Sequence, residues 1–515
     1  MNNINFIRIF LIFLFNSMSM SQTHIEADPF RQILIEKKAY DSKTLKISKI
    51  FRPIFIKTDT VSNSLLLQTD FFYNNNNPNQ ENMDLKYFSK GYSSFTSIKY
   101  SFNSPYLSLI FEPYLKFDKF YDVDNVDRDD IFSVLNDDEL NNQYFNNKNI
   151  RNFYISLHYK GVGFGYSKAN RWWGPGIHSS LQMSNNSYPL PSFFVGTINE
   201  LRFGKLGFYG LLSVTDLDDY KIKTHKKFLS SLNAGISWYG DKLISIGFSR
   251  NYLSGGSNII EYDWDINDAI NVLFEGVFTS NLINLEYTVG GHDFWDQTLS
   301  GYFVIDFPSR RFKVFAEFGF NDNRMYFADF LSQPDHSMAT IFGLRDYGDI
   351  PGGNLLWGFE WTNLMITYSS RHRPTGYGTW YEKRQYNYSS YHNRRWGAHS
   401  GADSDDWLIY LGFINDNFMI MQSFNYERHG IVSYRPAEVK IESITNINYK
   451  IKNFWFCVKY ENQFEAFLGF PGYFYQDINQ QKIDSSKGTL ANKRSTNTLI
   501  FTIFREFNFQ YFNFF

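Results

Sequence analysis

The stretch FKVFAEFGF, residues 312–320, shows the pattern that decides the fold. Every second residue from Phe312 to Phe320 is apolar, while Lys313 and Glu317 occupy intervening positions. Successive side chains of a β-strand point to opposite faces, so this alternation separates an apolar face from a face that carries charges. A charged face is a poor packed core. The stretch therefore predicts a strand with apolar surroundings on one side and water on the other.

The same alternation recurs in several other segments, including residues 232–238, 283–289 and 454–461. Such strands belong either to a soluble sandwich with one face exposed or to a membrane barrel with lipid outside and water inside. A sandwich predicts apolar faces of mainly Val, Ile and Leu, but several of these segments end in Tyr, Trp or Phe. Because aromatic belts at strand ends are favoured by the two membrane interfaces, we predict an all-β, antiparallel outer-membrane β-barrel.

The C-terminal stretch supports the same fold. Apolar residues alternate from Leu499 onward, and the chain stops on Phe515, which resembles the assembly signal of bacterial outer-membrane barrels. A tilted spanning strand takes about 9–11 residues, so the last strand is expected to end near Phe509. Dividing about 490 mature residues by roughly 25–30 per strand and connection predicts about 16–18 strands.

Composition excludes several other classes of protein. The 515 residues include 54 Phe, 36 Tyr and 11 Trp, and 50 basic residues balance 52 acidic ones. This near-neutral charge argues against a nucleic-acid partner and against a polybasic membrane anchor. The mean hydropathy of −0.37 and the lack of a long apolar stretch past the N-terminus exclude a helical membrane protein. A single cysteine, Cys457, excludes a disulfide framework, a multi-cysteine zinc site and an N-terminal lipoprotein anchor.

The N-terminus reads as an export signal over residues 1–21, with Arg8 before the apolar run from Ile9 to Phe15 and small residues at Ser19 and Ser21. We expect a short periplasmic segment over 22–50 and the transmembrane barrel over 51–515. These features predict localisation in a bacterial outer membrane. The expected partners are therefore membrane lipids, lipopolysaccharide and, during insertion, the barrel-assembly machinery.

The sharpest local motif is Arg171-Trp172-Trp173-Gly174-Pro175-Gly176. A proline between two glycines fits a tight turn better than a strand. Tryptophan rings stack on the faces of sugar rings, and an arginine binds acidic substituents, so the motif suits a glycan site. The alternative is a tryptophan girdle at the membrane interface next to a structural turn. The residues alone leave both interpretations open.

With the Asn/Pro-rich segment that follows, this motif resembles the Wzi-type capsule-assembly family of outer-membrane proteins. Looser matches follow along the chain from Phe51 to the end: Gly291, His292, Asp293, Gln297, Leu299, Gly301, Glu360, Tyr386, Tyr388, His392, Gly397 and Asp403. The resemblance implies a large barrel whose lumen is closed by extracellular loops, acting as a lectin that holds capsular polysaccharide at the cell surface. The best-known members carry an N-terminal helical bundle. Here Gln22–Ile50 is too short for one and shows no sustained 3.6-residue pattern.

A second loop is the most cationic and aromatic part of the chain. Its basic and aromatic residues are Arg371, His372, Arg373, Tyr377, Trp380, Arg384, Tyr386, Tyr388, Tyr391, His392, Arg394, Arg395, Trp396 and His399. Such a loop suits an acidic glycan. Alternatives are lipopolysaccharide phosphates or pairing with Asp403, Asp405 and Asp406. His392, His399 and Asp403 could ligate a metal, but solvated loop histidines are commoner, so we predict no metal site and no cofactor.

Three classes of function remain: a surface lectin for an exported, acidic capsular polysaccharide or exopolysaccharide, a diffusion porin for small solutes, and an outer-membrane lipid hydrolase. No Gly-x-Ser-x-Gly elbow is present, so we predict a protein that is not an enzyme. The predicted ligand-binding residues are Arg171, Trp172, Trp173, His292, Asp293, Arg371, Tyr388, His392, Arg394 and Arg395, and the predicted structural motif is Gly174, Pro175 and Gly176. Trp172 and Trp173 are expected to contact the ligand or to support residues that do. We further expect Glu286, Asp306, Glu317 and Glu360 to point into the lumen.

Overall fold

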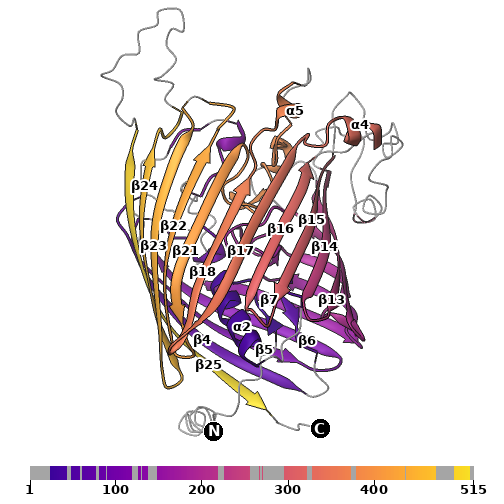
Figure 1. Cartoon of the computed structure of the whole chain (residues 1–515), viewed down its shortest axis with the longest axis vertical. Helices are drawn as coiled ribbons and strands as arrows, with labels where there is room; N and C mark the ends of the chain where they lie inside the picture. Colours follow the sequence, from indigo (N-terminus) through magenta and orange to yellow (C-terminus); the bar gives the residue numbers. More distant parts are fainter. Residues whose placement is uncertain are drawn as a thin grey trace, which may run out of the picture.

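The computed structural model describes residues 24–42, 48–57, 61–76, 81–88, 90–118, 126–128, 130–136, 148–217, 226–255, 266, 270, 295–321, 327–372, 378–434, 436–470 and 492–510. Their dominant element is a closed antiparallel barrel of 18 strands (Figure 1). This confirms the predicted fold and the upper end of the predicted strand number. The expected signal segment, residues 1–21, lies outside the described residues.

The barrel closes where the last strand pairs with the first long one, so the start of the first strand and the end of the last lie at the same end of the barrel. In order around the barrel its strands are β4 (Ser62–Asn74), β5 (Gly91–Asn103), β6 (Leu107–Asp118), β7 (Lys148–Tyr159), β8 (Val162–Lys168), β10 (Ser192–Thr197) with β11 (Leu201–Phe203), β12 (Leu206–Asp216), β13 (Lys227–Tyr239), β14 (Leu243–Gly255), β15 (Trp295–Phe307), β16 (Phe312–Asn321), β17 (Met338–Ile350), β18 (Gly353–Asn363), β21 (Ser404–Ile414), β22 (Phe418–His429), β23 (Glu438–Ile451), β24 (Phe454–Ala466) and β25 (Arg494–Gln510). Both β10 and β11 pair with β12 and together occupy one strand position. Strand β25 ends one residue after the expected Phe509.

Connections differ at the two ends of the barrel. At the end where β4 begins and β25 ends the strands are joined by short turns, such as residues 351–352 between β17 and β18. The opposite end carries long connections, including residues 169–191 and 364–403, with the short helices α4 (Phe327–Ser332) and α5 (Tyr368–Arg371). Short periplasmic turns and long extracellular loops are typical of outer-membrane barrels. The end with the long loops is therefore the outer end.

The predicted alternation is confirmed in the described strands, whereas residues 283–289 lie outside the described residues. In β16, Phe318 on the outer face is 46 % exposed, whereas Lys313 and Glu317 are buried inside the barrel. Exposed tyrosines lie near both ends of the barrel wall: Tyr73 pairs with Tyr92 at the outer end, and Tyr106, Tyr159 and Tyr449 lie at the periplasmic end. These positions agree with interfacial aromatic belts. Among the described residues, no helix has the length and apolar character needed to span a bilayer.

The N-terminal segment lies within the barrel, where it forms β1 (His24–Ile25), helix α2 (Pro29–Ser42), β2 (Phe51–Arg52) and β3 (Ile54–Phe55) (Figure 1). Proline at the first helical position and the Asp28 side chain, which accepts the Arg31 backbone N–H at 2.9 Å, fix the start of α2. Glu36 of this helix forms ion pairs with Lys313 and Arg345 of the wall. The described part of this segment thus contains one helix and no helical bundle, although the sequence shows no sustained 3.6-residue pattern. The wall around the helix carries charged side chains, so polar side chains of the helix are buried against it. Burial of this helix therefore does not require an apolar stripe.

Long loops and the N-terminal segment together fill the middle of the lumen. A single apolar cluster joins Phe51, Trp173 and Leu181 to wall residues such as Phe315 and to Trp380 of the loop between β18 and β21. Smaller packed clusters lie around Ile33, Phe55, Phe72 and Phe132. The lumen is closed by loops, as predicted. The interior of this barrel is a packed core, which places loop residues under the constraints that normally act on buried ones.

Candidate functional site

The tryptophan motif lies deep in the lumen on a short ribbon. Strand β9 (Trp172–Trp173) pairs with β2, so that Trp173 lies opposite Phe51 and Trp172 opposite Arg52. Trp172 is 0 % and Trp173 1 % exposed, and the Arg52 guanidinium lies 5.3 Å from the centre of the Trp172 ring. These rings are not girdle residues facing lipid. Buried rings have no free face for a sugar, so this position favours the supporting role over direct contact.

The turn after the tryptophans needs its glycines. Gly174 has a φ of +148°, and a Cβ added to Gly176 would lie 2.6 Å from Glu360 Oε1 and 2.8 Å from the Ser179 carbonyl oxygen. Arg52 Nη2 donates to the carbonyl oxygens of Gly174 and Gly176 at 3.3 and 3.2 Å. The close approach of backbone, carboxylate and guanidinium leaves no room for a side chain.

Two carboxylates of the barrel wall hold this loop in place. Glu360 of β18 accepts hydrogen bonds from the backbone N–H groups of Ile177, His178 and Ser179 at 3.0, 3.1 and 2.8 Å. Glu317 of β16 accepts one from Leu181 at 3.2 Å. Hydrogen bonds from N–H groups to a carboxylate are stronger than those to neutral acceptors. The loop is therefore fixed to two strands that are distant from it in sequence.

These contacts test the expected orientation of the wall carboxylates. Glu317 and Glu360 point into the lumen, and Asp306 also does so, because its side chain accepts the Tyr40 hydroxyl of α2 at 2.9 Å. The prediction is confirmed for these three residues, whereas Glu286 lies outside the described residues.

Arg394 and Arg395, which the sequence predicts to bind ligand, join two outer loops to each other. Arg394 lies 3.5 Å from the centre of the Tyr87 ring and donates to the Leu135 carbonyl oxygen at 3.3 Å. Arg395 Nη2 donates to the carbonyl oxygens of Ile131 and Val134 at 3.0 and 2.9 Å. Both arginines are 1 % exposed. Their charge was visible in the sequence, but the loop they hold, residues 130–136, is too distant along the chain to be inferred.

The other predicted residues are distributed over several depths. Tyr388 is buried and donates to Asp130 Oδ1 at 3.0 Å, and the half-buried His392 ring lies 5.0 Å from Tyr188. Arg371 is the last residue of α5 and is exposed at the outer end, where its Nε donates to the Ile366 carbonyl oxygen at 3.1 Å. Arg171 is buried beside the motif and donates to Ser192 Oγ at 2.9 Å. The two remaining predicted residues, His292 and Asp293, lie outside the described residues.

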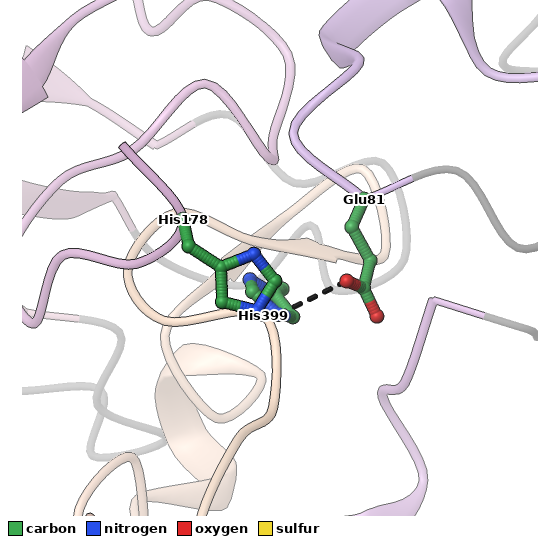
Figure 2. Close-up of side chains that lie close together, drawn as sticks. All are labelled: Glu81, His178 and His399. Atoms are coloured by element: carbon green, nitrogen blue, oxygen red, sulfur yellow. Dashed lines mark ion pairs between the residues drawn. The ribbon is translucent and has the colours of Figure 1, made fainter. Parts of the chain in front are cut away.

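A cluster that the sequence did not predict lies beneath these loops. His399 Nε2 is 3.0 Å from Glu81 Oε2 and 3.1 Å from Asp406 Oδ2 (Figure 2). His178 Nε2 is 2.9 Å from the same Asp406 oxygen, and the two imidazole rings are 4.6 Å apart in an edge-on arrangement. Burial lowers the pKa of His178, but the neighbouring Asp406 carboxylate outweighs it and raises that pKa to about 10. The cluster therefore concentrates charge in the barrel interior.

The combination of His392, His399 and Asp403 considered from the sequence is not assembled. Asp403 instead accepts the backbone N–H groups of Ile366, Val432 and Ser433 at 3.2, 2.9 and 2.8 Å, so it holds the ends of two loops together. Of the three, only His399 joins the cluster, with partners from other loops. A signal for His178 existed, since it follows the glycine turn by two residues, but nothing in the sequence connects it to Glu81.

Cavities adjoin the packed loops, and two of them exceed 300 Å³. One, of about 320 Å³, adjoins Glu81 and His178 and is lined by the inner faces of strands β4 and β22–β25, including Asp70, Glu442 and Lys459. The other, of about 330 Å³, lies toward the periplasmic end between α2 and the turns of the wall, and Pro175 reaches it. The glycine turn therefore lies between the two ends of the lumen.

No protein-family model matches the chain, and no curated protein matches it. Among solved structures, one similar fold is described as Wzi, an outer-membrane protein involved in group 1 capsule assembly in Escherichia coli and a carbohydrate-binding β-barrel. The TM-score is 0.60 at 9 % identity, covering 95 % of this chain and 100 % of that one. This chain is an outer-membrane β-barrel. A weaker likeness is a BenF-like porin from Pseudomonas fluorescens, with a TM-score of 0.42 at 10 % identity, covering 87 % of this chain and 99 % of that one. Another is OprD from Pseudomonas aeruginosa, with a TM-score of 0.42 at 8 % identity, covering 88 % of this chain and 97 % of that one. At these identities the likeness shows the fold alone.

Proposed function

We propose that this barrel binds an exported acidic polysaccharide, capsular or extracellular, at its outer end and holds it at the cell surface without chemical conversion. The observation that carries the proposal is the packed lumen, in which loops from distant parts of the chain are fixed to the wall and to one another. Such packing favours a rigid outer platform over an open channel. Preorganised platforms suit ligand binding because little ordering is needed when the ligand arrives.

The charge and exposure of the outer loops support an acidic ligand. Arg371, His372 and Arg384 are exposed on the loop between β18 and β21, and Tyr368 beside them is 72 % exposed. Guanidinium groups bind carboxylates through paired hydrogen bonds, and an exposed aromatic ring offers a face to a sugar. In this proposal the exposed residues contact the glycan. The buried Arg394 and Arg395 keep the loops in position.

The likeness to a carbohydrate-binding barrel and the resemblance of the tryptophan motif add support from outside the site. We propose that Trp172, Trp173 and the Gly174–Gly176 turn act as supports, since they fix the loop that carries His178 to the wall. Half-buried His392 completes the proposed outer surface, and the buried Tyr388 supports the loop through its hydrogen bond to Asp130.

A binding experiment with matched variants tests this proposal. Folded protein in detergent is passed over immobilised acidic and neutral bacterial polysaccharides, beside a double variant Arg371→Gln with Arg384→Gln. We expect binding to acidic polysaccharides and a loss of at least tenfold in affinity in the double variant. The control is Arg310→Gln, an exposed arginine at a periplasmic turn. Equal binding by the double variant and the control would contradict the proposed contact surface.

Passage of small solutes is a second candidate function, favoured by the two cavities that remain in the lumen. Their walls carry polar and charged groups, as the walls of porin channels do. Conductance in planar bilayers separates the two candidates. Steady ohmic conductance by the wild-type protein would support the porin, and its absence would support the closed platform.

A further inference from the structure

Side chains from four parts of the chain bring nitrogen and oxygen atoms close together inside the barrel, and Figure 2 shows three of them, Glu81, His178 and His399. Glu81 lies between β4 and β5, His178 between β8 and β10, His399 between β18 and β21, and Asp406 in β21. The ligand atoms of Glu81, His178 and His399 all lie within 4.8 Å of one another. Both imidazoles direct Nε2 at the same Asp406 oxygen, at 2.9 and 3.1 Å.

We propose that Glu81, His178, His399 and Asp406 form a binding site for a divalent transition-metal ion, with Zn²⁺ as the best fit. Two imidazoles and two carboxylates are a donor set that zinc accepts in tetrahedral sites. Their two negative charges balance the charge of the ion. Imidazole donors disfavour Ca²⁺ and Mg²⁺, which take oxygen ligands.

The spacing of the donor atoms agrees with this ion. Zinc bonds of about 2.0–2.1 Å in a tetrahedron place neighbouring ligand atoms roughly 3.3 Å apart. The three short separations around His399 and Asp406 are 2.9, 3.0 and 3.1 Å. These three contacts would each have to lengthen by only a few tenths of an ångström around an ion, and the Glu81 and His178 donor atoms lie within 4.8 Å of each other.

Unused bonding capacity at the same point supports a ligand. Among the described residues, Asp406 Oδ2 and His399 Nε2 are buried without a hydrogen bond of normal geometry, although both make the ion-pair contacts above. His399 is 2 % and Asp406 0 % exposed. Buried polar atoms left without hydrogen bonds are costly, and coordination of a metal ion at these atoms would remove that cost.

The surroundings of the four donors also suit a metal site. Glu360 accepts the backbone N–H of His178, and Asn425 donates to Asp406 Oδ1, so these two ligands are held by second partners. Lys440 pairs with Glu81 Oε1 and leaves Oε2 directed at His399. The cavity of about 320 Å³ that adjoins Glu81 and His178 provides a path for the ion. A bound ion would join three outer loops to strand β21.

Zinc binding by the whole protein tests the site. The protein is purified without a polyhistidine tag, and bound metal is removed with a chelator. The chelator is then removed, the protein is titrated with ZnCl₂, and bound zinc is measured by mass spectrometry. We expect one tightly bound Zn²⁺ per chain that Ca²⁺ in excess does not displace. His178→Gln and His399→Gln should each weaken binding at least tenfold. The control His372→Gln removes an exposed histidine of the same loop as His399 and should bind as wild type.

X-ray absorption on the zinc-loaded wild type gives a result that does not depend on the folding of variants. We expect only nitrogen and oxygen neighbours, with scattering from two imidazoles. A gentler variant, Glu81→Gln, changes a residue whose side chain is 12 % exposed, and should also weaken binding. Lack of stoichiometric zinc in the wild type, a sulfur neighbour, or unchanged affinity in folded His178→Gln and His399→Gln proteins would each overturn the proposal.

Discussion

Replacing Glu360 by Gln tests whether wall carboxylates hold the tryptophan loop in the lumen. The substitution keeps the size of the side chain but exchanges one acceptor oxygen for a donor. At the position of Oε2 it leaves the buried N–H of Ile177 without an acceptor, which costs about 1–3 kcal/mol. The bonds from His178 and Ser179 change from charged to neutral acceptors, with a loss of about 1 kcal/mol each. We therefore expect the loop to be destabilised by about 3–5 kcal/mol.

Hydrogen exchange followed by mass spectrometry measures this effect on the loop itself. Because each 1.4 kcal/mol is about a factor of ten, amides at residues 177–179 should exchange roughly a hundred to several thousand times faster. The backbone amides of the barrel strands should stay protected from exchange. The control Glu465→Gln changes a lumen-facing glutamate of β24 that pairs with Arg494 and should leave this loop unchanged. Unchanged exchange at 177–179 in a folded Glu360→Gln protein would refute the reasoning.

Other substitutions test neighbouring parts of the plug. The double variant Trp172→Ala with Trp173→Ala should still form a heat-modifiable, inserted barrel but bind polysaccharide more weakly, because each lost buried ring costs about 3–5 kcal/mol in loop stability. Gel mobility measures folding of the barrel, and a glycan-binding assay measures the loss of binding. Gly176→Ala should displace the loop from Glu360 and speed its amide exchange, whereas Gly301→Ala, where a Cβ meets open space, should not. Glu36→Gln leaves the buried Lys313 and Arg345 of the wall without their carboxylate, and breaking a buried pair costs about 3–5 kcal/mol. Conductance in planar bilayers and amide hydrogen exchange in α2 should therefore both rise.

The strands could be predicted from the sequence because each one meets lipid on one face. In β16 the lipid-facing Phe318 and the inward Glu317 alternate with a period of two, which is visible without any knowledge of partners. Helix α2 could not be predicted in this way. It lies among charged wall residues such as Lys313 and Arg345, so burial does not require an apolar stripe.

The site was harder to predict because residues far apart in sequence assemble it. The basic residues Arg394 and Arg395 suggested ligand contacts, but their side chains hold residues 130–136 through backbone carbonyl oxygens. The Gly174–Gly176 part of the motif lies outside the strands, as expected, but Trp172 and Trp173 belong to the short strand β9, and their burial became visible only when β9 was seen to pair with β2. Loop-to-loop packing inside a barrel leaves no periodic signal in either loop.

Binding and conductance measured on one folded preparation test the central claim most directly. Wild-type protein that shows heat-modifiable gel mobility is divided between immobilised acidic polysaccharides and planar bilayers. We predict saturable binding that weakens as salt concentration rises, because charge pairs at the exposed outer loops are screened, together with no steady conductance. Steady ohmic conductance without binding to any acidic polysaccharide would contradict the claim that this loop-filled barrel is a glycan-binding platform.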